Sequence, residues 1–319
     1  MSCGNLSVPY PFGIGPAKCY VPGFKLTCDT SHRPPRLMLG RLQVVDISLR
    51  KNTIRVINID RVSRFDDFIR SFNGISFGIG PGEAVPYSLS THNELILMGC
   101  NVQAVLSNTG KNREILSGCS SFCPTNKNVT YDTAAASSMD DKEYCYGMGC
   151  CQAHISTSRD GMPSELWVDW IDPNMYSVRL LPLSYVFIAA EGWFNKSWVS
   201  AQLPESSWTN GLGPRLKVPT ILDWEILQLQ PTSSQQLANV SIPQRKTQYI
   251  KCPGICRSKN SLCKPMIRGY SCQCSEGYDG NAYLIDGCKG LHACTSLIQA
   301  VNLLCRLLLI LYMLNLINL

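Results

Sequence analysis

The sequence predicts a mainly β protein made of small disulfide-rich extracellular modules in tandem. The 319 residues include 17 cysteines, far more than a reduced cytosolic protein carries. Short apolar runs are separated by many of the 24 glycines and 19 prolines, and no long helical periodicity occurs. A content of 45% hydrophobic and 16% charged residues is typical of folded domains and excludes a disordered chain.

The cysteines fall in two blocks, nine from Cys3 to Cys151 and eight from Cys252 to Cys305. Zinc modules use paired C-x-x-C or Cys/His spacings, which are absent here, and the chain has only four histidines. We therefore expect disulfides, no metal site and no cofactor. Four N-x-S/T sequons predict glycosylation on the secretory route: Asn5, Asn128, Asn195 and Asn239. Residues 1–20 contain no signal peptide, which favours a mature or truncated sequence.

The first region reads as strands and turns. Its opening, residues 3–16, is too rich in proline and glycine to be helical. Apolar residues then alternate at 45–49, Lys51-Asn52 offers a turn, and residues 53–59 continue the pattern, which predicts a β-hairpin. Residues 95–98 and 102–106 predict two more strands.

The next hundred residues, up to about Ile250, contain no cysteine, so apolar packing must hold them. Residues 183–190 and 218–226 predict strands, and residues 232–236 a polar linker. All six tryptophans of the chain lie in this region and are candidate core anchors, with stacking on sugar rings as the alternative: Trp167, Trp170, Trp193, Trp198, Trp208 and Trp224.

The net charge of +6 is concentrated at the start of the chain. Residues 1–70 hold eleven basic and five acidic side chains, whereas basic and acidic groups cancel in the remainder. This asymmetry favours a polyanionic partner, and the alternative is a solvated basic face without a ligand. Nucleic acid is not expected, since a disulfide-rich chain without a recognition motif does not fit that class.

Six cysteines between residues 252 and 288 follow the spacing C-x3-C-x6-C-x8-C-x-C-x13-C. This segment resembles an EGF-like domain. The resemblance implies the pairs Cys252–Cys263, Cys256–Cys272 and Cys274–Cys288, which a segment too short for a real core needs for stability. Lys251 and Pro265 stand where a calcium-binding repeat would carry acidic or amide groups, which argues against calcium.

The last residues, 297–319, are mostly apolar and long enough to span a bilayer. Arg306 lies near the middle of this segment, and a charged side chain there raises the free energy of membrane insertion by roughly 2.5–3.5 kcal/mol. We therefore keep two interpretations of the tail at 291–319, a membrane anchor that gives the chain membrane association, or an artefact of the gene model.

Three motifs in order carry a family resemblance. The opening CGNLSVPYPFGIG, with Cys19-Tyr20 and the FKLTC that ends at Cys28, resembles the galacturonan-binding module of plant wall-associated receptor kinases. GMGCCQ at 147–152, EGWF at 191–194 and VPTILDW at 218–224 resemble the region that follows it, and the EGF-like repeat comes third. The resemblance implies four regions: 1–125, 126–250, 251–290 and the tail at 291–319.

The resemblance also implies disulfides at Cys19 and Cys28. A cysteine that relatives carry near the end of the first strands is missing from residues 62–67, so one thiol of the nine in the first block is left over.

We expect a non-enzymatic extracellular or plasma-membrane protein that faces the cell wall and binds pectin or polygalacturonate. Binding of a peptide or receptor through the EGF-like region is the alternative. Aromatic rings near the N-terminus would stack on sugars or pack locally: Tyr10, Phe12, Tyr20 and Phe24. The candidate glycan-binding residues are Arg50, Lys51, Arg55, Arg41, Lys25 and Tyr20.

Catalytic motifs give little support for an enzyme. No kinase motif occurs in the sequence. GISFG at 74–78 fits a hydrolase nucleophile elbow around Ser76, but the glycines and proline after it do not favour the helix that an elbow needs. The acidic pairs Asp66-Asp67 and Asp140-Asp141 are interpreted as solvated turns.

Overall fold

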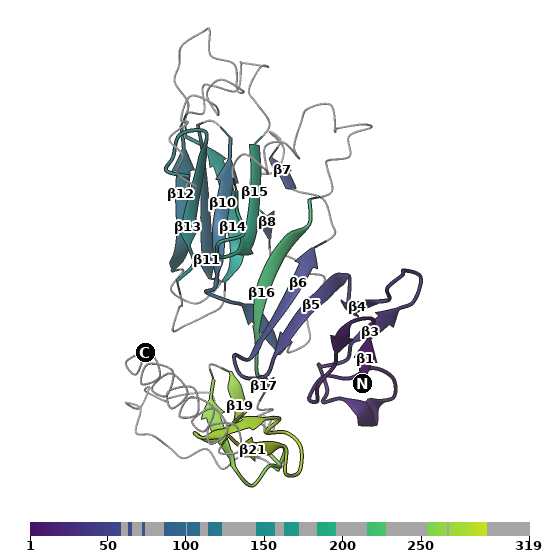
Figure 1. The fold of residues 1–319 in the computed structure, drawn as a ribbon. Helices are drawn as coiled ribbons and strands as arrows, with labels where there is room; N and C mark the ends of the chain where they lie inside the picture. The colour runs from purple at the N-terminus through teal and green to yellow at the C-terminus, as the bar shows by residue number, and fades with distance from the viewer. Residues whose placement is uncertain are drawn as a thin grey trace, which may run out of the picture. The chain divides into compact units, whose positions relative to one another are not determined.

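The computed structural model confirms a mainly β, disulfide-rich protein (Figure 1). Among the described residues it contains strands, one short 3-10 helix at Ala17–Cys19 and five disulfides. The chain divides into two compact units, Met1–Leu227 and Gln228–Leu319. The structure describes residues 1–58, 63–65, 72–73, 86–99, 101–108, 114–122, 145–156, 163–171, 184–195, 216–227, 254–266 and 268–291.

A six-stranded antiparallel sheet contains the predicted hairpin. Its order is β3 (Thr27–Asp29), β4 (Arg36–Leu39), β5 (Leu42–Ser48), β6 (Thr53–Asn58), β16 (Val218–Trp224) and β9 (Tyr87–Leu89). Asn52 closes the hairpin with φ of +55°, a conformation that asparagine tolerates better than most residues. A register shift between Val44 and Asp46 places Val44 and then Ile47 on one face, so the predicted alternation is interrupted by a bulge.

An aromatic cluster lies on the buried face of this sheet. The ring of Phe12 lies 5.1 Å from that of Phe24 and 5.3 Å from that of Trp224, both edge-to-face, and Tyr87 lies 5.8 Å from Phe24. Phe12, Phe24 and Trp224 are each 1% exposed. Gly13 is required beside them, because a Cβ there would come within 2.1 Å of the Cys19 carbonyl oxygen. The proline- and glycine-rich opening is therefore a packing motif.

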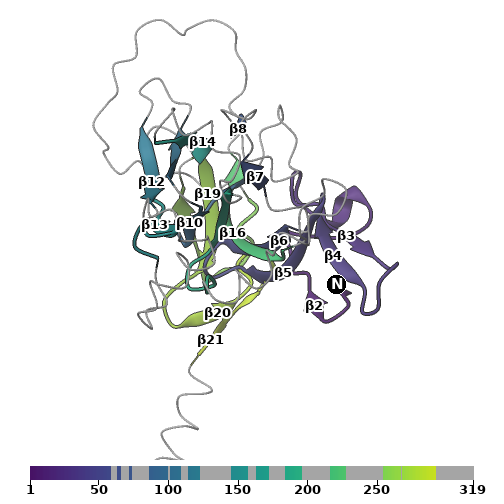
Figure 2. The ribbon, with the colours of Figure 1, turned by 90° about the horizontal axis from the view of Figure 1, so that it is seen from above.

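Two four-stranded sheets also belong to the first unit (Figures 1 and 2). One has the order β13 (Cys150–His154), β10 (Asn93–Met98), β15 (Ser184–Ala190) and β7 (Ser63–Phe65). The other has the order β12 (Ile115–Ser121), β11 (Val102–Asn108), β14 (Pro163–Trp170) and β8 (Phe72–Asn73). β12 contacts both β10 and β13, and the Cys119–Cys151 disulfide joins the two sheets. The two-residue strands of this unit are β1 (Ser2–Cys3), β2 (Leu6–Ser7), β17 (Ile226–Leu227) and the β8 strand named above.

Strands from both sides of the expected boundary at residue 125 share sheets. β15 pairs with β10, and β16 pairs with β6 and β9. The Thr220 hydroxyl also donates to the Ile188 carbonyl, 3.2 Å away, which links β16 to β15. The first compact unit therefore runs to Leu227 and includes strands from both expected regions, 1–125 and 126–250.

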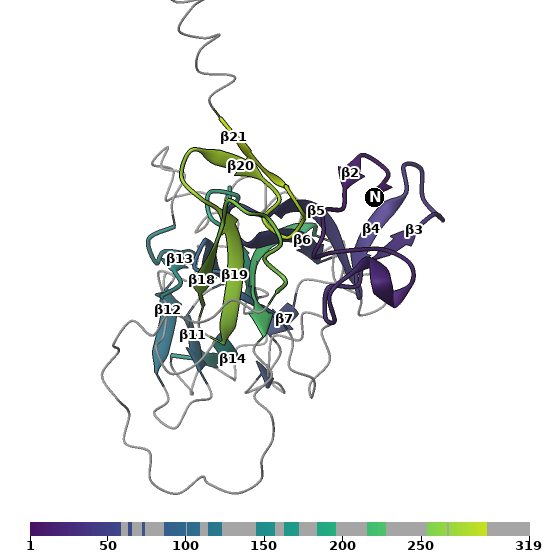
Figure 3. The same ribbon diagram turned by 90° about the horizontal axis from the view of Figure 1, so that it is seen from below.

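The EGF-like segment is described from Gly254 to Leu291, apart from residue 267 (Figure 3). It contains two hairpins, β18 (Ser261–Pro265) with β19 (Gly269–Cys274) and β20 (Tyr278–Gly280) with β21 (Cys288–Gly290). Tyr283 is its fully buried aromatic residue, and its hydroxyl accepts the Cys272 amide at 2.9 Å. The implied disulfides Cys256–Cys272 and Cys274–Cys288 are present.

Two cysteine assignments differ from the sequence analysis. Cys28 is bonded to Cys3, with the Cα atoms 5.7 Å apart, so Cys19 is a free, partly exposed thiol. This agrees with the odd cysteine count, because the sequence lacks one partner. Cys263 is also a free thiol, and its expected partner Cys252 lies outside the described residues. Cys145 is bonded to Cys150.

Several predictions fall outside the described residues: the glycosylation sites Asn128 and Asn239, the elbow at Ser76, both acidic pairs and the tail at 292–319. Within the part of the chain that is described, no helix has the length and apolar character needed to cross a membrane.

Candidate functional site

The first 58 residues concentrate the positive charge of the chain on the surface. They carry eight basic and two acidic side chains, a net charge of +6. Seven of the eight basic residues are exposed, and Arg36 is partly buried. The exposed ones are Lys18, Lys25, Arg33, Arg41, Arg50, Lys51 and Arg55.

One group of candidate ligand residues lies at and beside the β5–β6 hairpin. Arg50 and Lys51 occupy the turn, where the Lys51 amide donates to the Ser48 hydroxyl at 3.2 Å. Arg55 follows on the open face of β6, since its neighbours Ile54 and Val56 are both buried. The turn thus presents two adjacent cations, and the strand adds a third.

A second group lies at the other end of β5. Arg41 occupies the β4–β5 turn, and Lys25 precedes β3, whose Thr27 pairs with Met38 near that turn. The backbone of Lys25 also forms an isolated parallel β-bridge with Gly13, and Tyr20 lies beside Gly13. Seven residues of β5 at about 3.3 Å each separate the two turns by roughly 20–25 Å. The six candidates therefore form two groups and not one patch.

The two acidic residues of this segment lie opposite arginines in the sheet. Asp46 pairs with Arg55, and Asp29 pairs with Arg36. Hydrogen bonds from the Ser31 side chain and backbone, with the nearby His32 contributing less, lower the pKa of Asp29. The two acidic residues thus lie beside Arg55 and Arg36 in the sheet.

The four aromatic candidates divide by burial. Phe12 and Phe24 are 1% exposed in the aromatic cluster, so the local-packing alternative holds for them and they do not reach a ligand. Tyr10 and Tyr20 are partly exposed. Of the tryptophans, Trp224 is a core anchor, although its core includes rings from the N-terminal segment.

Two groups of polar residues lie outside this sheet. Asn5 and Asn195 of the predicted glycosylation sites are exposed.

Glu94, His154 and Glu191 lie close enough together to hold a metal ion. These three residues could not be predicted from the sequence, because strand register and not sequence spacing brings them together.

Comparison with known proteins gives one family-model match and several relatives that align with most of the chain. Residues 1–58 match the family model described as wall-associated receptor kinase galacturonan-binding. Wall-associated receptor kinase 3 of Arabidopsis thaliana is 29% identical over 313 residues, which cover 93% of this chain and 36% of the relative. Wall-associated receptor kinase 5 is 28% identical over 303 residues, with 93% and 35% covered. Wall-associated receptor kinase-like 10 is 27% identical over 320 residues, with 92% and 39% covered.

No solved structure matches the chain. The chain spans about a third of the length of the curated relatives it matches. These matches confirm the resemblance inferred from the motifs: the chain is similar to the wall-associated receptor kinases over nine-tenths of its own length, and it opens with a module of their galacturonan-binding type.

Proposed function

We propose that this chain binds acidic cell-wall polysaccharide, pectin or polygalacturonate, as the extracellular region of a receptor-like protein and without a catalytic step of its own. The observation that carries the proposal is the coincidence of two features in residues 1–58. This segment matches the galacturonan-binding model, and it holds a net charge of +6 with seven exposed cations.

Repetition along the polymer supplies the binding mechanism. Polygalacturonate carries one carboxylate per sugar, so each exposed cation meets a partner wherever the chain lies across the sheet. Single exposed ion pairs contribute at most about 1 kcal/mol and are screened by salt. Affinity must then come from several contacts made at once, at both turns of β5. Tyr20, beside Gly13 in the group of Lys25 and Arg41, would add a ring for a sugar face.

The proposed location is outside the cell or at the plasma membrane, facing the wall. Five disulfides among the described residues fit an oxidising compartment. The exposed sequons at Asn5 and Asn195 fit the secretory route and are proposed as glycosylated.

The test is retention of the full chain on immobilised polygalacturonate across a salt gradient. The charge reversal Arg50→Glu with Lys51→Glu should shift elution to markedly lower salt, because the turn loses both cations. The matched control is Arg257→Glu with Lys259→Glu, which changes the net charge equally on exposed residues of the EGF-like segment. Equal shifts for the two variants, or retention that salt does not affect, would refute a specific role for the β5–β6 turn.

One observation favours the second candidate function, binding of a peptide or receptor by the EGF-like segment. Large apolar side chains are exposed on it, among them Ile285 at 75%, Leu262 at 58% and Leu291 at 48%. Such side chains are typical of protein-binding surfaces when they form one patch. Loss of a protein partner in Leu262→Ser with Ile285→Ser, with polygalacturonate retention unchanged, would support this function beside the first.

A further inference from the structure

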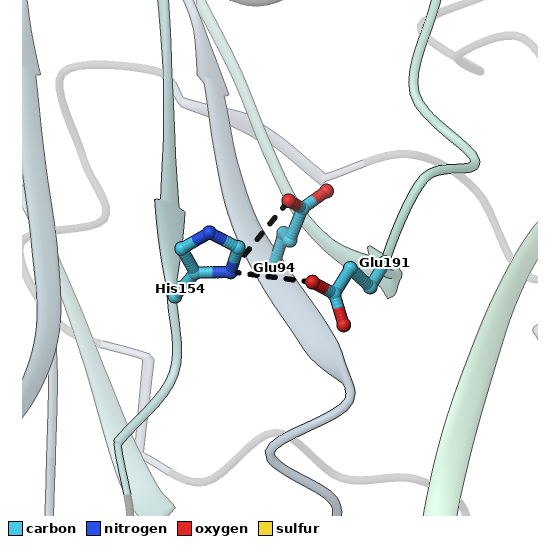
Figure 4. Close-up of side chains that lie close together, drawn as sticks. All are labelled: Glu94, His154 and Glu191. Carbon is cyan, nitrogen blue, oxygen red and sulfur yellow. Dashed lines mark ion pairs between the residues drawn. The ribbon is translucent and has the colours of Figure 1, made fainter.

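Three strands of one sheet bring Glu94, His154 and Glu191 to the same place (Figure 4). The Nδ1 atom of His154 lies 3.8 Å from Oε1 of Glu94 and 3.8 Å from Oε1 of Glu191. One nitrogen of His154 and one carboxylate oxygen of each glutamate all lie within 4.8 Å of one another.

The register of the sheet produces this cluster. Glu94 on β10 pairs directly with His154 on β13, and directly opposed residues in antiparallel strands point to the same face. On the other side Glu94 pairs with Ala189 of β15, and Glu191 follows two residues later. The Glu191 amide donates to the His92 carbonyl at 3.0 Å, which fixes the turn after β15 against the start of β10.

We propose that Glu94, His154 and Glu191 form a binding site for a divalent transition metal, zinc in the first instance. Zinc takes imidazole nitrogen and carboxylate oxygen at about 2.0–2.2 Å, so tetrahedral ligand atoms lie about 3.4 Å apart. The two 3.8 Å separations need to shorten by only a few tenths of an ångström. His154 and Glu191 are 65% and 51% exposed, so their side chains have the freedom to make this adjustment.

The least mobile member of the site is oriented by a neighbour. The side chain of Glu94 is only 2% exposed, and Gln152 Nε2 donates to its Oε2 atom at 2.5 Å. This hydrogen bond leaves Oε1 directed to His154, in the way that outer hydrogen bonds orient metal-binding carboxylates. The other amide atom, Gln152 Oε1, is buried and has no hydrogen-bond partner among the described residues.

The nitrogen and oxygen donors favour a transition metal over calcium. Calcium takes six to eight oxygen ligands, whereas imidazole suits zinc, copper, iron and nickel. A second imidazole is near, since His92 Nδ1 lies 4.0 Å from Oε2 of Glu191, and it is the candidate fourth ligand. The competing explanation is that protonated histidines make ion pairs with the two glutamates, in which case metal affinity is absent.

The experiment is zinc binding to the full chain by calorimetry, after stripping with a chelator and alkylation of free thiols. Alkylation is needed because Cys19 and Cys263 are themselves potential zinc ligands. We expect one zinc per chain, with affinity lowered at least tenfold in His154→Ala and in Glu191→Gln. Both substitutions change half-exposed or more exposed side chains, so the fold is retained. Gln152→Ala should lower affinity about 10–100-fold through the orienting hydrogen bond.

His32→Ala is the matched control. His32 also faces a carboxylate, with its Nδ1 3.1 Å from Oδ2 of Asp29, but belongs to no three-residue cluster among the described residues. Zinc binding in this variant should equal that of the unaltered chain. Absence of zinc binding, or equal loss in His32→Ala and His154→Ala, overturns the proposal. Replacement of zinc by cobalt gives a second readout, because tetrahedral nitrogen and oxygen ligation should produce visible absorption that His154→Ala removes.

Discussion

The six-stranded sheet and the EGF-like segment are stabilised in different ways. The sheet packs on four aromatic rings, those of Phe12, Phe24, Tyr87 and Trp224. One disulfide, Cys3–Cys28, links its edge strand β3 to β1. The EGF-like segment encloses Tyr283 and carries two disulfides within the described residues. Below about 40 residues a core alone seldom stabilises a fold, which explains the crosslinks in the second case.

The two regions also differ in how local their contacts are. The hairpins of the EGF-like segment pair strands that are neighbours in sequence. In contrast, the first 58 residues rely on β16, since Val56 pairs with Thr220 and Phe12 packs on Trp224. A segment that matches a family model need not therefore be a folding unit. The following predictions test this difference, from the largest expected effect to the smallest.

A fragment of residues 1–125 should fail to reach the native fold, whereas residues 1–227 should reach it. The shorter fragment lacks β15 and β16, so Val56 and Phe24 lose the strand and the tryptophan that cover them. Hydrogen exchange followed by mass spectrometry measures the outcome on β5 and β6. Equal protection of these strands in both fragments would show that the first region folds alone.

Trp224→Ala should destabilise the first unit by about 3–5 kcal/mol, since it empties a fully buried site beside the rings of Phe12 and Phe24. Trp193→Ala is the comparison, because Trp193 is only partly buried against Phe187 and should cost less. Denaturant unfolding monitored by hydrogen exchange on β6 gives both values. If Trp224→Ala lowered the free energy of unfolding less than Trp193→Ala does, the aromatic cluster would not be the main source of stability in this unit.

Loss of a disulfide should have different consequences in the two regions. Cys256–Cys272 closes a loop of 16 residues and Cys3–Cys28 a loop of 25 residues. From loop-closure entropy, these disulfides should stabilise the folded state by about 3 and about 3.5 kcal/mol. Replacing Cys256 and Cys272 by serine should unfold the EGF-like segment, since little apolar core remains. The same change at Cys3 and Cys28 should leave β5 and β6 protected from exchange. Loss of protection in β5 and β6 would contradict the distinction.

The smallest effect concerns Asp223 on β16. Burial raises the pKa of this carboxyl, and a hydrogen bond from the Ser90 side chain offsets part of the rise. Because the folded state then binds the proton more tightly than the unfolded state, stability falls as pH rises from about 4 through the folded-state pKa. Asp223→Asn should raise the melting temperature at neutral pH and change it little at pH 4. A pH-independent difference, measured with a chelator present, would contradict this cause.

Local patterns were sufficient to predict many elements of the fold. The hairpin around Lys51-Asn52 and the strand at 218–224 could be predicted because alternation and turn residues are local signals. Two of the EGF-like disulfides followed from the family spacing. The pairing of Cys28 with Cys3 could not be derived, since several partners are compatible with one cysteine count.

Long-range pairing was not predictable from local patterns. The sequence places Trp224 far from Phe12, and Glu94 far from both His154 and Glu191. Only the strand order of the sheets brings these residues together. The same limit applies to the basic residues, whose net charge is visible in the sequence while their separation into two groups along β5 is not.

The most direct test of polysaccharide binding is the affinity of the full chain for oligogalacturonates of increasing length at fixed low salt. Because Lys25 and Arg41 lie roughly 20–25 Å from Arg50 and Lys51 along β5, affinity should rise steeply until the oligomer spans both groups and then level off. The double reversal Arg50→Glu and Lys51→Glu should abolish the rise. Affinity that does not depend on length, or a rise that survives the reversal, would contradict binding across the two turns.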